Sequence, residues 1–105
     1  MEEIQAKADE LSKKLGVNVL PIVFVDEDTN EQIVGYIKEP TRIVKLRAMD
    51  KAMTSPMTAS AELLEAVLIR DQSDTRIDTV DKYYMGATVE AFKTVEISVN
   101  SFKKK

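Results

Sequence analysis

Two short apolar runs, rich in β-branched and aromatic residues and joined by a polar segment, constrain the fold of this chain more than any other feature. The runs are residues 17–25 and 33–38, and the segment 26–32 between them reads Asp-Glu-Asp-Thr-Asn-Glu-Gln. Such runs on either side of a polar connection are typical of a β-hairpin. Pro21 lacks a backbone N–H, so the first strand is expected at a sheet edge or at a bulge. The sequence therefore predicts a hairpin over residues 17–38.

Helical periodicity is found on both sides of this hairpin. Residues 1–16 place apolar side chains at spacings of four, three and four, and Gly16 ends the pattern. An amphipathic helix of about four turns is expected there. After the hairpin, Glu39-Pro40-Thr41 breaks the strand and starts a second helix. Thr54-Ser55-Pro56 ends that helix and begins a third, because Ser suits an N-cap and Pro suits the first helical position.

The last predicted helix follows the polar connection 71–76, and either Asp78 or Thr79 can cap it. Its far end is ambiguous, because residues 95–102 alternate apolar and polar side chains as in a strand and yet also continue the helical face. We favour the helix. The predicted fold class is α+β in one small domain, 1–105, made of an N-terminal helix 1–16, a hairpin 17–38, three helices within 41–102 and a basic tail 103–105.

The composition excludes several classes of function. The chain has no Cys and no His, so thiol nucleophiles, imidazole bases and the usual zinc and haem ligands are missing. With 15 basic and 18 acidic side chains, its net charge is -3, which disfavours broad binding to nucleic acid. The apolar stretches are too short to cross a bilayer, and the acidic start does not fit a secretory signal. We therefore expect a cytoplasmic protein that binds neither nucleic acid nor membrane, and a binding or structural role is favoured over catalysis.

Two groups of acidic residues have the composition of cation sites but are better explained by local structure. Asp26, Asp28 and Asn30 have the alternate spacing that opens a calcium loop, but the Gly and Glu that this loop needs at its sixth and twelfth positions are missing. A solvated hairpin tip accounts for these residues. The second group comprises Asp71, Asp74, Asp78 and Asp81. Asp is common in helix caps and turns, which explain this group equally well. We therefore predict no metal and no cofactor.

The second helix has a basic polar surface. Four cations fall within ten residues, but no aromatic or Gly-rich element is interleaved with them, and Asp50 dilutes the charge. A solvated helix face, or a face that meets an acidic protein, is therefore expected in preference to a phosphate-binding site. The four cations are Arg42, Lys45, Arg47 and Lys51.

Methionines gather around the junction of the second and third helices. Met49 and Met53 lie with Ile43 and Leu46 along one side of the second helix, and Met57 follows in the third. Methionines at helical spacing most often belong to a core. Their flexible side chains also suit a surface that accepts apolar partners of several shapes, so both interpretations stay open here.

Several landmarks also occur in a characteristic order. Gly35-Tyr36-Ile37-Lys38 leads into Glu39-Pro40-Thr41-Arg42, and Ser55-Pro56 leads into Ser60-Ala61-Glu62-Leu63-Leu64. A polar loop then precedes Asp81-Lys82-Tyr83-Tyr84. This order resembles the tail assembly chaperones of long-tailed bacteriophages and prophages, which carry an aromatic-x-[Lys/Arg]-x-Pro-[Ser/Thr]-Arg segment and an aromatic pair before the last helix. The similarity spans about residues 33–98, although the family's small Gly-rich loop after the Leu-Leu helix is missing.

The resemblance implies a non-enzymatic chaperone in the cytoplasm of the bacterial host. Such proteins bind the long, apolar, helix-rich tape measure protein and keep it soluble while tail tube subunits polymerise. The tape measure protein is then the expected partner, and the major tail tube protein is a second one. Covering apolar helices reversibly calls for an adaptable apolar face. We predict that the partner-binding residues are Met49, Met53, Met57, Leu64, Tyr84, Arg42, Lys45 and Lys51.

Other classes stay open at this point. A structural tail subunit, or an oligomeric protein-protein interaction module of a phage or prophage, would use a hairpin that pairs with its neighbours. A homo-oligomer is a further alternative, and a small metal-dependent enzyme or regulator would use the second Asp group. The chain ends in Phe102-Lys103-Lys104-Lys105. The resemblance also implies a longer product made by ribosomal frameshifting near the end of the short one. Lys codons are rich in A, and runs of A favour such frameshifting.

Overall fold

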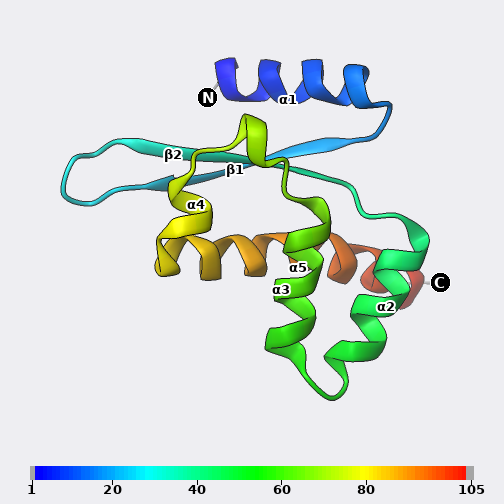
Figure 1. Cartoon of the computed structure of the whole chain (residues 1–105). Coiled ribbons are helices and arrows are strands. Elements are labelled where there is room, and N and C mark those ends of the chain that lie inside the picture. The colour runs from blue at the N-terminus through cyan, green and yellow to red at the C-terminus, as the bar shows by residue number, and fades with distance from the viewer. Residues whose placement is uncertain (1, 104–105) are drawn as a thin grey trace.

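The computed structural model describes residues 2–103, with side chains described for residues 2–95. The fold is mixed α+β, with an N-terminal helix, a two-stranded antiparallel hairpin and then helices, as the sequence predicts (Figure 1). The elements are α1 (Glu2–Leu15), β1 (Val19–Val25), β2 (Gln32–Lys38), α2 (Arg42–Ala52), α3 (Pro56–Val67), the 3-10 turn η1 (Arg70–Gln72), α4 (Arg76–Thr79) and α5 (Asp81–Lys103).

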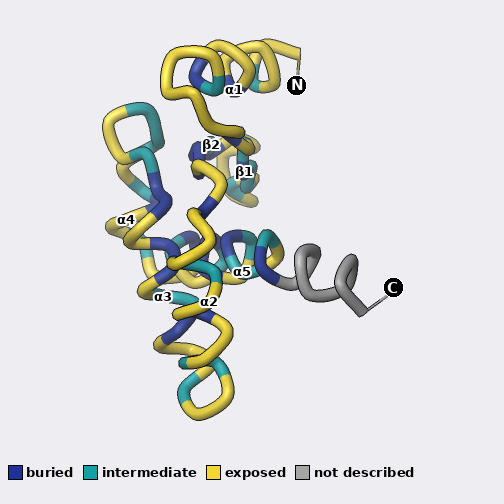
Figure 2. The backbone as a smooth tube through the Cα atoms, turned by 90° about the vertical axis from the view of Figure 1, so that its right-hand side faces the viewer, coloured by how far each residue is buried: buried dark blue, intermediate teal, exposed yellow. Residues whose placement is uncertain are grey.

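The hairpin lies between α1 on one face and the later helices on the other (Figure 1). Successive strand residues point to opposite faces, so Ile33 and Ile37 join the main core with the helices while Tyr36 packs under α1. The main core also takes Leu63 and Leu64 from α3, and the smaller cluster takes Ala8 and Leu11 from α1. Figure 2 shows that most of α1 and the tip between α2 and α3 are exposed.

The outer edge of β2 is covered by the segment that follows α3. The backbone N–H of Ile69 donates to the carbonyl oxygen of Tyr36 at 2.9 Å, and the N–H of Tyr36 donates to Ser73 Oγ at 3.0 Å. Further along the same edge, the N–H of Asp74 donates to the carbonyl oxygen of Val34 at 2.9 Å. Both Val34 and Tyr36 therefore direct their backbone groups away from β1.

The partners of these residues on β1 direct their backbone groups to the opposite, outer edge of the hairpin. Pro21 pairs with Tyr36 and Val23 pairs with Val34, so Pro21 places its missing donor on this outer edge, as expected for an edge strand. The N–H of Val19, at the start of the same edge, donates to Ser12 Oγ at 2.9 Å. The first half of the β1 edge therefore has no free backbone N–H with which to pair with another strand. Val23 and Val25 lie in the second half of the same edge.

The helix starts agree only in part with the prediction. Thr41 caps α2, because its Oγ1 accepts a hydrogen bond from the N–H of Val44 at 3.3 Å. Ser55 occupies the N-cap position of α3 and Pro56 the first turn, but the Ser55 side chain makes no capping hydrogen bond. Only the backbone carbonyl of Ser55 bonds into the helix, accepting from the N–H of Ala59 at 2.9 Å.

The start of the last helix differs from the prediction. Neither Asp78 nor Thr79 caps it, because both belong to the short helix α4 and α5 begins at Asp81. Val80 separates the two helices in an extended conformation, with φ of -107° and ψ of 117°, and packs against the main core. The preference for helix over strand at residues 95–102 is confirmed, since α5 continues to Lys103. Of the predicted basic tail, Lys104 and Lys105 lie outside the described residues.

Over residues 2–103, each helix is too short or too polar to cross a membrane.

Candidate partner-binding surface

Helices α2 and α3 form a helical hairpin whose tip points away from the sheet (Figures 1 and 2). The inner side of α2 is apolar but small, because Val44 and Ala48 are the side chains that it adds to the main core. From α3, Ala59 and Leu63 are buried on the facing side. The packing of α2 on the body therefore uses few of its apolar atoms.

The larger apolar side of α2 faces solvent. Positions 43, 46, 49 and 53 are three or four residues apart, so they follow one side of the helix, away from Val44 and Ala48. Their exposed fractions decide the point: 64% for Ile43, 56% for Leu46, 37% for Met49 and 84% for Met53. We call these four residues the α2 stripe. Contiguous exposed apolar surface of this kind marks interaction sites in soluble proteins.

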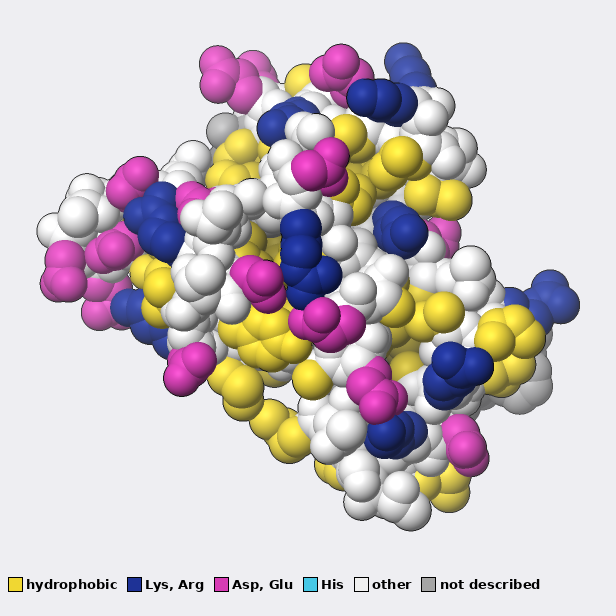
Figure 3. Space-filling model, in the orientation of Figure 1, with side chains coloured by type: hydrophobic (Ala, Val, Ile, Leu, Met, Phe, Trp, Pro, Cys, Tyr) yellow, Lys and Arg dark blue, Asp and Glu magenta, His cyan; other side chains and the backbone are white. Residues whose placement is uncertain are grey.

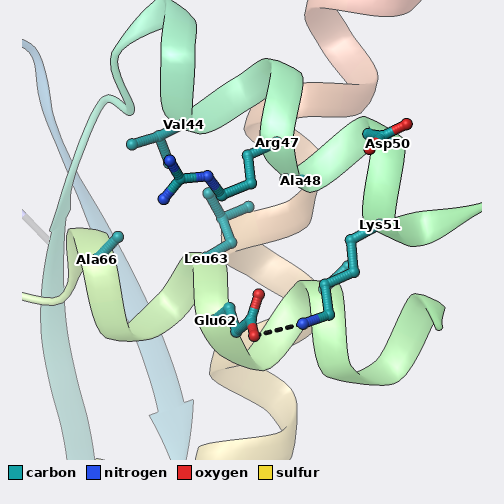
Figure 4. A pocket seen from close by; sticks show the side chains of 9 residues that line it. Val44, Arg47, Ala48, Asp50, Lys51, Glu62, Leu63 and Ala66 are labelled. Carbon is teal, nitrogen blue, oxygen red and sulfur yellow. Dashed lines mark hydrogen bonds and ion pairs between the residues drawn. The ribbon is translucent and has the colours of Figure 1, made fainter.

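A groove with a volume of about 540 Å³ lies between α2 and α3 (Figure 4). Its floor is apolar, with small side chains at Ala48, Ala59 and Ala66 beside Leu63. The Nζ of Lys51 and the Oε1 of Glu62 form an ion pair across it, drawn as a dashed line in Figure 4. Its charged lining residues are Arg47, Asp50, Lys51 and Glu62.

The four basic residues of α2 differ in whether they form ion pairs. Lys45 bonds Glu39 at 3.4 Å, and Lys51 bonds Glu62 across the groove. Arg42 and Arg47 are exposed, and within the part of the chain that the structure describes neither of them forms an ion pair. An exposed pair such as Lys51–Glu62 contributes little to stability, so Lys51 can exchange its partner at small cost.

The structure brings together only some of the residues predicted to bind a partner. Met49, Met53 and Arg42 share the exposed side of α2, and Met57, 61% exposed, lies just beyond the tip in α3. Leu64 has no exposed surface and belongs to the main core, so a partner cannot contact its side chain in this conformation.

Tyr84 lies apart from the α2 stripe, on α5. Its side chain is half-buried, and its hydroxyl donates to Glu65 Oε2 at 3.0 Å. Burial, together with the hydrogen bond to Glu65, raises the pKa of Tyr84 above its ordinary value of 10.0. Tyr84 therefore links α5 to α3, and it is no part of the exposed side of α2.

Sequence reasoning missed Arg47 and Glu62 as groove residues. The signal that could have found them is the set of alanines at 48, 59 and 66, because small side chains on facing helices leave space between them. Ile43 and Leu46 are also missing from the predicted partner-binding residues, although both lie on the same side of the helix as Met49. A helical period identifies an apolar side but not the side that faces the core.

Several side chains of the two acidic groups are engaged in local structure. Arg70 Nε donates to Asp78 Oδ2 at 3.2 Å, and Arg76 Nη2 donates to Asp74 Oδ2 at 2.7 Å. The hydrogen bond with Arg76 holds the pKa of Asp74 below its ordinary value of 3.8. At the hairpin tip, Asp26 Oδ1 accepts from the N–H of Asp28 at 2.9 Å, as in an Asx turn. Within residues 2–95, no group of three or more acidic side chains is placed to hold a metal ion.

Comparisons of the chain with protein-family models, with curated proteins and with solved structures each found no match.

Proposed function

We propose that this chain is a non-enzymatic tail assembly chaperone of a long-tailed phage or prophage. It acts in the cytoplasm of the bacterial host, binding the apolar helical tape measure protein during tail assembly, with the major tail tube protein as a second partner. The observation that carries the proposal is the α2 stripe, four large apolar side chains that the fold leaves uncovered. The order of motifs that resembles this family supports the same function.

The size of the stripe suits a reversible interaction. Fully burying a side chain of this kind contributes about 1.5 to 3 kcal/mol, so covering the exposed parts of these four contributes about 4 to 7 kcal/mol. Association itself costs at least about 4 kcal/mol in lost translational and rotational freedom. A single stripe therefore binds weakly. A long partner that meets many copies of the chain is covered well, and each copy still leaves readily when the tail tube forms.

The second candidate, a structural tail subunit or an oligomeric interaction module, would join its neighbours through the edges of the hairpin. The β2 edge is already bonded to the segment after α3. On β1, Ser12 takes the donor of Val19 and Pro21 has none. Both features favour the chaperone over the subunit. A homo-oligomer stays a prediction, and sedimentation of the purified chain measures it.

Co-expression with the tape measure protein of the same phage or prophage tests the proposal. The native chain is expected to raise the fraction of tape measure protein in the soluble lysate and to co-purify with it. The double variant Met49→Asp/Met53→Asp is expected to lose both effects, because it places two charges in the apolar stripe.

The matched control is Met85→Asp/Val89→Asp, which removes two exposed apolar side chains from α5 instead. It is expected to behave as the native chain does. Equal recovery of the tape measure protein with both double variants, each folded by far-UV circular dichroism, would contradict the proposed site. No effect of the native chain on the tape measure protein would contradict the proposed function.

A further inference from the structure

Helix α2 is a basic element on an acidic protein. Four of its side chains are basic and one, Asp50, is acidic, so α2 carries a net charge of +3. The whole chain carries -3, and the remainder therefore carries -6. The same helix exposes the α2 stripe, so the concentration of positive charge and the uncovered apolar surface coincide. Figure 3 shows hydrophobic side chains between Lys and Arg side chains over this region, at the lower right.

Two cations border the stripe and form no ion pair with the side chains that the structure describes. Arg42 precedes Leu46 by four residues, so it stands at the head of the stripe, and Arg47 lies on its flank, about 100° around the helix from Leu46. Neither forms an ion pair within the described residues, whereas Lys45 and Lys51 form ion pairs with Glu39 and Glu62. Guanidinium groups bind carboxylates with two parallel hydrogen bonds. The free cations therefore present a geometry that an acidic partner fits.

We propose that the α2 stripe binds an amphipathic helix that carries carboxylates along the flank of its apolar side. The inference rests on the proposed function for the helical nature of the partner, and adds the chemistry by which that partner is selected. From Arg42 to Met53 the surface is about 16 Å long, at about 1.5 Å per residue, so it accepts about three turns of a helix. Arg42 and Arg47 are five residues apart, and the partner's carboxylates are therefore spaced about 7.5 Å along its axis.

Basic amphipathic helices also bind anionic membranes or nucleic acid, and the structure argues against both. The rest of the chain carries a net charge of -6, which repels a phosphate-rich surface. Helix α2 has no aromatic residue on which a base could stack. Its eleven residues are also tied to the body through Ala48 and Val44, so the helix has no freedom to lie flat in a lipid interface.

A pair of synthetic peptides tests the inference on the full chain. One is a fluorescein-labelled helix of about 15 residues with Leu at helical spacing and Glu on both flanks. The other has Lys in place of every Glu. Fluorescence anisotropy is expected to show about ten-fold tighter binding of the acidic peptide at about 50 mM salt, with the difference shrinking at about 500 mM because salt screens the ion pairs. In Arg42→Glu/Arg47→Glu, the preference is expected to reverse toward the basic peptide.

The matched control is Lys13→Glu/Lys14→Glu, which makes the same change of net charge on the exposed end of α1. It is expected to keep the native preference. Equal binding of the two peptides, or a preference that the Arg42→Glu/Arg47→Glu variant leaves unchanged, overturns the inference. Binding of phosphatidylglycerol vesicles or of single-stranded DNA that the acidic peptide does not displace also overturns it.

The two proposals fail separately. If the tape measure protein still co-purifies with Arg42→Glu/Arg47→Glu at native yield, selection by charge is wrong while the chaperone function stands. If the peptide preference reverses as expected but the native chain never retains the tape measure protein, the chaperone function is wrong while the selection by charge stands.

Discussion

Replacing Leu64 and Leu46 by Ala, one at a time, removes the same atoms from two neighbouring helices with very different expected costs. Leu64 is fully buried in the main core, whereas Leu46 is 56% exposed in the α2 stripe. Leu64→Ala is expected to lower the free energy of unfolding by about 3 kcal/mol, from the lost transfer term and the cavity left behind. A domain of this size unfolds with an entropy change of about 0.2 kcal/mol/K at Tm, so a loss of about 3 kcal/mol lowers Tm by about 10 to 20 °C.

Leu46→Ala is expected to cost less than about 1 kcal/mol, because more than half of its side chain is already in water and Ala is the better helix former. Urea titrations followed by far-UV circular dichroism measure both free energies under identical conditions. Equal losses for the two variants would mean that the α2 stripe is buried in solution and is not available to a partner. A loss at Leu46 that grows with protein concentration would identify a second copy as the group that covers it.

Three further variants test other parts of the structure. Gly86→Ala is expected to cost about 1 to 3 kcal/mol, because a Cβ there would lie 2.7 Å from Phe24 Cε1, and unchanged stability would mean that α5 does not approach β1 so closely. Since Arg76 lowers the folded pKa of Asp74, the stability that this carboxylate adds is present at neutral pH and lost as the pH falls below about 3.8. Asp74→Asn is expected to flatten the acid limb of Tm against pH, and an unchanged limb would exclude the pair. Tyr83→Phe is expected to be neutral or stabilising by up to about 1 kcal/mol, because the buried hydroxyl has no hydrogen-bond partner among the described residues, and a loss above about 1 kcal/mol would reveal a partner for it.

Local patterns predict most of the fold. The composition of the two strands, the polar segment between them and the Pro at position 21 are enough to place an edge strand in a hairpin, because strand residues alternate between faces and Pro cannot donate. The boundary before α5 was not predictable in this way. Val80 adopts an extended conformation where its side chain enters the main core, and that depends on packing with distant residues. The two capping residues predicted for α5 are absorbed into α4 for the same reason.

For the candidate site, the sequence predicts the residue types but not which side chains are exposed. The period of α2 places Leu46, Met49 and Met53 on one side, but it does not say whether that side faces the core. The answer depends on α3, which packs against the smaller side through Ala48. Leu64 has the same helical pattern in its own helix and is fully buried. Exposure is thus decided by tertiary packing, which neither pattern contains.

NMR spectroscopy of the methionine methyl groups tests most directly whether the partner binds the α2 stripe. With ¹³C-labelled methyl groups, Met49, Met53 and Met57 report on the α2–α3 hairpin, and Met85, 46% exposed on α5, is an internal control. Adding the tape measure protein is expected to shift or broaden the signals of Met49 and Met53 and to leave Met85 unchanged. A shift of Met85 with unchanged Met49 and Met53 would contradict the claim that the α2 stripe is where the partner binds.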